Sequence, residues 1–125
     1  MIEFTVPGPP VTKKNSLRLV RNPKTGGVIP IPSAQFQRYQ ERAGYYLTHK
    51  RALLDGRYNV RCVYYMPTRR RVDLANLLEA TCDILTHYGV LKDDNSDIVA
   101  SHDGSHVRYD KEHPRVEIAL EEVTP

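Results

Sequence analysis

Hydrophobic and polar residues alternate at the start of the chain, a pattern typical of β-strands. Ile2, Phe4 and Val6 occupy every second position before the run Pro7-Gly8-Pro9-Pro10. This pattern predicts a short strand that ends in a rigid loop. Two further apolar runs, 17–21 and 28–31, flank a turn rich in Pro and Gly. They predict a hairpin whose prolines mark a sheet edge.

The period changes to helical after Ser33, which is a suitable N-cap. Apolar side chains then recur at three- and four-residue intervals, which predicts a first helix over residues 34 to about 53. Alternation returns at residues 58–66 and stops at Pro67, which predicts a longer strand.

A second helical stripe begins at Asp73 and ends near Gly89, a common C-terminal stop. On a helical wheel Asp73 and Asn76 flank the apolar stripe. Four positions are expected to lie opposite the core: Ala75, Glu79, Cys82 and Thr86.

The C-terminal region contains apolar positions at residues 98–107 and 116–120, separated by a polar turn at 110–114. These predict two closing strands. The expected class is α+β, a small mixed sheet with two helices packed on it. A chain of 125 residues suits one domain spanning 1–125.

Charge is divided unevenly along the chain. Residues 1–71 hold 14 of the 18 Lys and Arg against three acids, whereas residues 72–125 hold four bases and 12 acids. This asymmetry favours a polyanionic partner for the basic part and metal or proton chemistry in the acidic part, although solvated surfaces also collect charge.

Cys62 and Cys82 have no Cys-x-x-Cys or Cys-x-x-His partner. They are expected to be buried thiols in a reducing compartment. The N-terminus lacks the features of a signal peptide, and no stretch approaches the roughly 20 apolar residues of a membrane span. These features predict a cytoplasmic protein.

Two acidic places could carry chemistry. Asp73 stands where a helix begins, and Asp94 follows 21 residues later beside Asp93. Neighbouring carboxylates repel unless a cation neutralises them, and Mg²⁺ accepts one or two carboxylates together with water and phosphate oxygens. Taken alone, Asp73 would be interpreted as a helix cap, and the segment around Asp93 would be interpreted as a turn.

The sequence offers two alternative metal sites. Asp93, Asn95 and Asp97 have the alternate spacing of a calcium loop, but Ile98 and Gly104 stand where that loop needs Gly and Glu. A zinc site is a weaker alternative, because the spacings of its candidate ligands match no familiar pattern. Those ligands would be Cys82, His87, His102 and His106.

Basic residues lie directly before the first acidic position. Arg69, Arg70 and Arg71 precede Asp73, and Lys13 and Lys14 follow the N-terminal proline loop. Such residues could neutralise phosphates beside a scissile bond, or simply form a solvated surface.

Together these motifs resemble the RusA-type Holliday-junction resolvases of bacteria and prophages. The matching features are the Pro9-Pro10 loop with Lys13, Lys14 and Asn15, the arginine run, the segment Asp73-Leu74-x-Asn76-Leu77, the residues Ala80, Asp83, Leu85 and Gly89, and the pair Asp93-Asp94. The resemblance covers nearly the whole chain.

The resemblance implies a RusA-like fold and a homodimeric, Mg²⁺-dependent endonuclease that makes paired nicks in four-way DNA junctions. It implies catalytic roles for Asp73 and Asp94, which would hold the metal. Beyond the resemblance, we expect Asp93 to complete the site together with Glu79 or Asp97, and Mn²⁺ could substitute for Mg²⁺. DNA contacts are expected from Lys13, Lys14, Asn15, Arg69, Arg70, Arg71 and Asn76. When bound to DNA, the protein would associate with the nucleoid.

The chain departs from the family pattern at two positions. Ala75 stands where the family usually has Asp, and Glu79 where it has an important Lys. An alternative is therefore a catalytically weakened or inactive protein that only binds junctions. A further alternative is a phage accessory protein that binds a protein partner through its acidic half.

Overall fold

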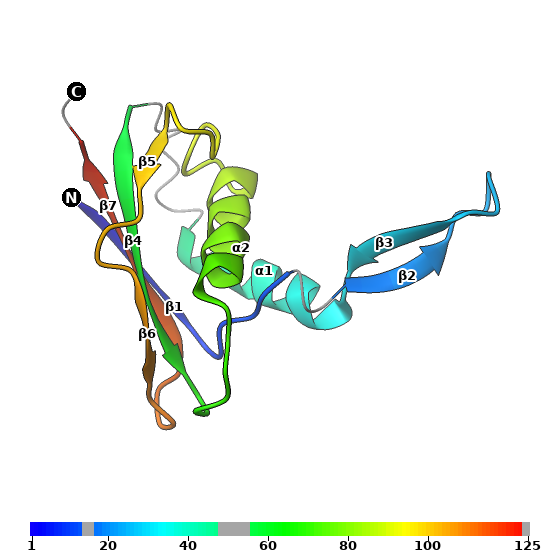
Figure 1. The fold of residues 1–125 in the computed structure, drawn as a ribbon, viewed down its shortest axis with the longest axis horizontal. Coiled ribbons are helices and arrows are strands. Elements are labelled where there is room, and N and C mark those ends of the chain that lie inside the picture. Colours follow the sequence, from blue (N-terminus) through cyan, green and yellow to red (C-terminus); the bar gives the residue numbers. More distant parts are fainter. Residues whose placement is uncertain (14–16, 48–55, 124–125) are drawn as a thin grey trace.

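The structure, a computed structural model, describes residues 1–13, 17–47 and 56–123. One sheet contains β1 (Ile2–Pro7), β7 (Arg115–Glu122), β4 (Tyr58–Met66), β5 (Val99–Ser101) and β6 (His106–Tyr109). β7 lies between β1 and β4 and is antiparallel to both, while β5 and β6 follow one another along the other edge of β4 and run parallel to it. Helices α1 (Ala34–Leu47) and α2 (Leu74–His87) lie on one side of this sheet (Figure 1). The architecture is α+β, with a mixed sheet.

A second, two-stranded sheet extends away from the first. β2 (Leu17–Arg21) and β3 (Val28–Pro32) pair antiparallel, from Leu17 opposite Pro32 to Arg21 opposite Val28. Figure 1 shows this hairpin projecting from the body beyond the start of α1. The hairpin predicted from the sequence is thereby confirmed.

β4 pairs with β7 on one side and with β5 and β6 on the other, and its alternation suits a sheet with one covered face. Val60, Cys62 and Tyr64 are fully buried beneath the helices. The intervening Arg61 is exposed and lies on the opposite face. Pro67 follows the strand and cannot donate a ladder hydrogen bond.

The two helices begin as the sequence predicts. The Ser33 hydroxyl accepts a 3.2 Å hydrogen bond from the Phe36 amide at the start of α1. α1 is described as far as Leu47, and the predicted extension to residue 53 falls on residues outside the described part. Where α2 ends, Tyr88 packs on α1: its hydroxyl donates to the Gln40 carbonyl at 2.8 Å, and a Cβ on Gly44 would come within 2.6 Å of its ring.

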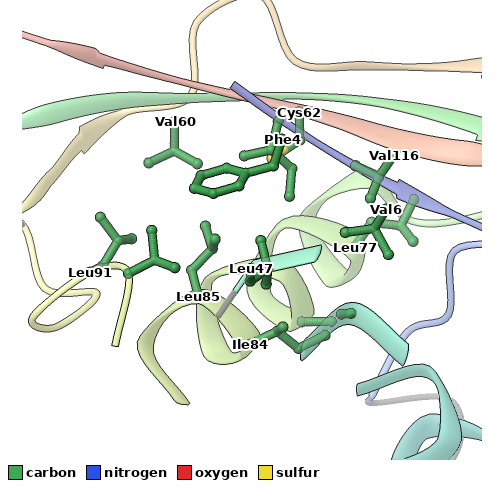
Figure 2. Close-up of a cluster of buried hydrophobic side chains, with 14 of the residues drawn as sticks. Phe4, Val6, Leu47, Val60, Cys62, Leu77, Ile84, Leu85, Leu91 and Val116 are labelled. Atoms are coloured by element: carbon green, nitrogen blue, oxygen red, sulfur yellow. The ribbon is translucent and has the colours of Figure 1, made fainter. Parts of the chain in front are cut away.

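The core fills the space between the sheet and the helices (Figure 2). Phe4 and Val6 enter it from β1, and Leu77 and Leu85 from α2. One polar pair lies within it. The Thr81 hydroxyl donates to the Leu77 carbonyl at 2.9 Å, so the Tyr64 hydroxyl, 2.6 Å away, donates to Thr81.

One sequence prediction is wrong in detail, and another is incomplete. The region predicted to form two closing strands forms three, because residues 102–105 leave the ladder in a turn at Gly104, whose φ is +86°. Cys82 lies on the same side of α2 as Ala75 and Glu79, yet it is not exposed. It is buried, as is the hydroxyl oxygen of Thr86, whereas Ala75 and Glu79 are exposed as expected. The wheel missed this because it cannot anticipate the loop packed against that side of α2. Both cysteines are buried free thiols, as predicted.

Candidate active site

Asp73 begins α2 as its N-cap. Its backbone is extended (φ −86°, ψ 114°), and its Oδ1 accepts a 2.9 Å hydrogen bond from the Ala75 amide. The carboxylate is exposed. A helix N-terminus carries unpaired N–H groups and partial positive charge, so the end that Asp73 caps also suits a phosphate.

A hollow of about 320 Å³ lies beside α2. α2 contributes Ala75, Leu78, Glu79 and Cys82, and the segment after the helix contributes Asp94, Val99 and His102. The structure therefore brings two candidate metal ligands, Glu79 and Asp94, to one hollow. Asp73 and Asp93 do not line it.

The two neighbouring aspartates of the loop have different surroundings. The Asp93 side chain forms hydrogen bonds within its own loop. Its Oδ1 accepts one from the Asp94 amide at 2.8 Å, and its Oδ2 accepts one from the Asn95 side chain at 3.2 Å. Asn95 in turn accepts from the Asp97 amide at 2.9 Å. Asp93 thus shapes the loop, and Asp94 faces the hollow.

Asp94 lies in an environment that disfavours its charge. Although the residue remains exposed, its pKa is raised above the ordinary carboxyl value, first by partial removal from water, then by its interaction with the Asp93 side chain and by the negative charge of Asp83. A bound cation would relieve this repulsion. Glu79 and Asp94 offer oxygen donors, which Mg²⁺ prefers, and two carboxylates suffice when water and phosphate complete its shell.

Within the described ranges, no three His, Cys, Asp or Glu side chains lie close enough together to hold a metal ion. This finding gives the zinc alternative no support. It also means that the proposed acidic cluster of Asp73, Glu79, Asp93 and Asp94 is not assembled as a ready-made cage.

His102 also lines the hollow, although no sequence motif identifies it as part of the acidic site. Its Nδ1 lies 2.9 Å from the Val60 carbonyl, so Nδ1 carries the proton and Nε2 is the ring nitrogen left for a ligand. The turn between β5 and β6, which carries His102, is hydrogen-bonded to β4. The Asn59 Oδ1 accepts from the Ser101 hydroxyl at 2.6 Å and from the Asp103 amide at 2.7 Å. Only the strand pairing reveals this placement, because His102 lies at the break between β5 and β6.

The basic candidates have different surroundings. Arg69, Arg70 and Arg71 are exposed in the connection that leads into α2. Lys13 pairs with Asp83 of α2 at 3.6 Å. Lys14 and Asn15 lie outside the described residues, and Asn76 is half-buried on α2.

On this small α+β domain, carboxylates of α2 and of the loop after it lie near an exposed basic segment. The family model described as endodeoxyribonuclease RusA matches residues 7–121, and the chain belongs to this family. Membership implies nuclease activity of the Holliday-junction resolvase kind. No curated protein sequence matches the chain. In the described part of the chain, no helix has the length and apolarity needed to cross a membrane.

Proposed function

We propose that the protein is a Mg²⁺-dependent endonuclease that resolves Holliday junctions and related branched DNA by paired phosphodiester hydrolysis. The observation that supports this most strongly is the shared hollow of Glu79 and Asp94, in a chain of the RusA family.

Each acidic residue has its own part in the proposal. Glu79 from α2 and Asp94 from the loop after it line the hollow, where their carboxylates would hold the metal, and Asp93 fixes the loop that carries Asp94. Asp73 keeps the first turn of α2 in place with one oxygen, while its exposed carboxylate can turn toward a metal beside the helix N-terminus. When bound, Mg²⁺ or Mn²⁺ would polarise the phosphoryl group and lower the pKa of an attacking water.

DNA would be held by the bases beside this site. Arg69, Arg70 and Arg71 are exposed immediately before Asp73, so phosphates that they contact lie close to the acidic residues. Asn76 would add a polar contact from α2, and Lys13 would do so from the N-terminal loop, where Lys14 and Asn15 follow it. Because Lys13 is already paired with Asp83, we assign the larger share of the binding energy to the arginines.

A symmetric homodimer suits this substrate, because two equivalent sites then face two equivalent strands of a four-way junction. The four-way junctions would belong to chromosomal or prophage DNA. A protein that acts on them would work in the cytoplasm and associate with the nucleoid.

A second candidate function is junction binding without efficient cleavage. Ala75 favours it, because this methyl group lines the hollow at a position where a carboxylate would add a ligand. Fewer carboxylates mean weaker binding of a hard cation.

Incubating the purified protein with an end-labelled four-way junction separates these functions. The nuclease proposal predicts paired nicks in Mg²⁺ or Mn²⁺ and none in chelator. A retarded junction that remains intact across the metal titration would favour the binding function.

A further inference from the structure

Two arginines stack on tyrosine rings at the end of β4 that leads toward α2. The Arg69 guanidinium carbon lies 4.2 Å from the centroid of the Tyr109 ring, and that of Arg115 lies 3.7 Å from the centroid of Tyr65. Both distances are those of cation–π contacts.

The two arginines differ in what surrounds their N–H groups. Arg115 donates from Nε to Glu117 at 3.0 Å, and from one terminal nitrogen to Asp110 at 2.9 Å and to the His113 carbonyl at 2.8 Å. Three of its five N–H donors are therefore used within the protein. Among residues 1–13, 17–47 and 56–123, Arg69 has no carboxylate partner and no guanidinium hydrogen bond. Stacking uses the face of a guanidinium and leaves its in-plane donors available.

The sheet fixes the position of the Arg69 stack. Tyr109 is the last residue of β6 and pairs with Met66, the last residue of β4, and the Asp110 amide donates to the Met66 carbonyl at 2.9 Å. Arg69 follows Met66 by three residues and precedes Asp73 by four. The stack thus lies between the end of a strand ladder and the capped start of α2.

We propose that Tyr109 is a positioning residue for DNA binding, which holds the Arg69 guanidinium flat so that its free N–H edge meets a backbone phosphate of a DNA arm. The inference rests on the proposed DNA-binding function of the arginine run. It distinguishes Arg69 from Arg70 and Arg71, for which no aromatic support is found in the described residues. Arg is suited to this role because its planar fork loses little freedom when one face is already held.

Binding of a labelled junction and of a linear duplex, measured in chelator over a range of salt concentrations, tests this role. Tyr109→Leu should weaken binding about two- to five-fold, the range set by an exposed cation–π contact, while Tyr109→Phe should bind as wild type does. Arg69→Gln should weaken binding and flatten the slope of log affinity against log salt by about 0.9. Adding Tyr109→Leu to Arg69→Gln should have no further effect, because the tyrosine acts through the arginine.

Tyr65→Leu is the matched control, since it removes the stack beneath Arg115, whose Nε and one terminal nitrogen already bind within the protein. The affinity of this variant should equal that of wild type. The inference is overturned if wild type binds DNA but Tyr109→Leu binds equally well, if Tyr109→Phe is as weak as Tyr109→Leu, or if the losses from Arg69→Gln and Tyr109→Leu add. Wild-type protein that binds neither DNA would overturn the proposed function as well. Wild-type binding without cleavage would leave this inference standing and count only against the nuclease.

Discussion

Ala75, in the first turn of α2, and Asp94, in the loop beyond that helix, line the same hollow. The helical wheel places Ala75 away from the apolar stripe, and the structure shows that the hollow lies on that side of the helix. A carboxylate at position 75 would therefore project toward Glu79 and Asp94 rather than into open solvent.

Ala75→Asp should lower the metal concentration needed for half-maximal junction cleavage, because the hollow gains an anionic ligand. Glu79→Gln should raise it. Ser96→Asp is the matched control, since it adds the same charge to the neighbouring exposed loop outside the hollow. A metal titration of cleavage for the four proteins measures these shifts. If Ala75→Asp and Ser96→Asp behave alike, position 75 does not provide a ligand.

Asp94→Asn should stabilise the metal-free protein at neutral pH. The pKa of Asp94 is raised in the fold, so its ionised form carries a cost that is present at pH 7 and disappears below the ordinary carboxyl pKa of about 4. The gain in Tm should therefore shrink as the pH falls.

Asp110→Asn should change the Tm at pH 7 in the opposite direction. The His113 amide, and then Arg115, hold the pKa of Asp110 below its ordinary value, so its stabilisation is present above about pH 4 and is lost as the pH falls through the lowered pKa. This variant should have a lower Tm than wild type at pH 7. Thermal melts of both variants from pH 3 to pH 8 would contradict the account if the two differences had the same sign at pH 7.

Thr81→Val should destabilise the protein by about 1–3 kcal/mol, because the buried Tyr64 hydroxyl loses its acceptor. Tyr64→Phe in the same chain removes the stranded donor, so the double variant should recover part of the loss. Urea unfolding of the single and double variants measures the coupling. Strictly additive losses would show that the hydroxyl pair contributes no interaction of its own.

Replacing Arg69, Arg70 and Arg71 together with Gln should weaken DNA binding to a similar degree for all sequences. Each lost phosphate contact should flatten the salt slope by about 0.9 on duplex arms. Junctions of unrelated sequence, compared by fluorescence anisotropy, provide the measurement. An unchanged slope would identify the run as a solvated surface.

Local patterns predicted much of the fold, because strand alternation, the Ser33 and Asp73 caps and the stop near Gly89 act within a few residues of sequence. The break between β5 and β6 was not predictable in this way. It depends on side chains from a distant strand, with Asn59 binding the turn at Ser101 and Asp103.

In the candidate site, too, some residues could be predicted from local sequence and others depend on tertiary packing. Asp94 was predicted from spacing and family resemblance, whereas Glu79 was proposed as a ligand at a position where the family has Lys; the structure places both at one hollow. His102 and Cys82 reach the same hollow only through tertiary packing. Helical periodicity could not reveal that the loop carrying Asp94 folds back on α2.

The most direct test of the central claim is cleavage of an end-labelled four-way junction in Mg²⁺ and in Mn²⁺ by wild type, Asp73→Asn and Asp94→Asn. Asp97→Asn is the matched control, because Asp97 is exposed in the same loop and does not line the hollow. We expect wild type and Asp97→Asn to make paired nicks. Asp73→Asn and Asp94→Asn should make none while binding the junction at least as tightly, since removing a carboxylate relieves repulsion of the DNA. Near-normal turnover by Asp73→Asn and Asp94→Asn would contradict the account.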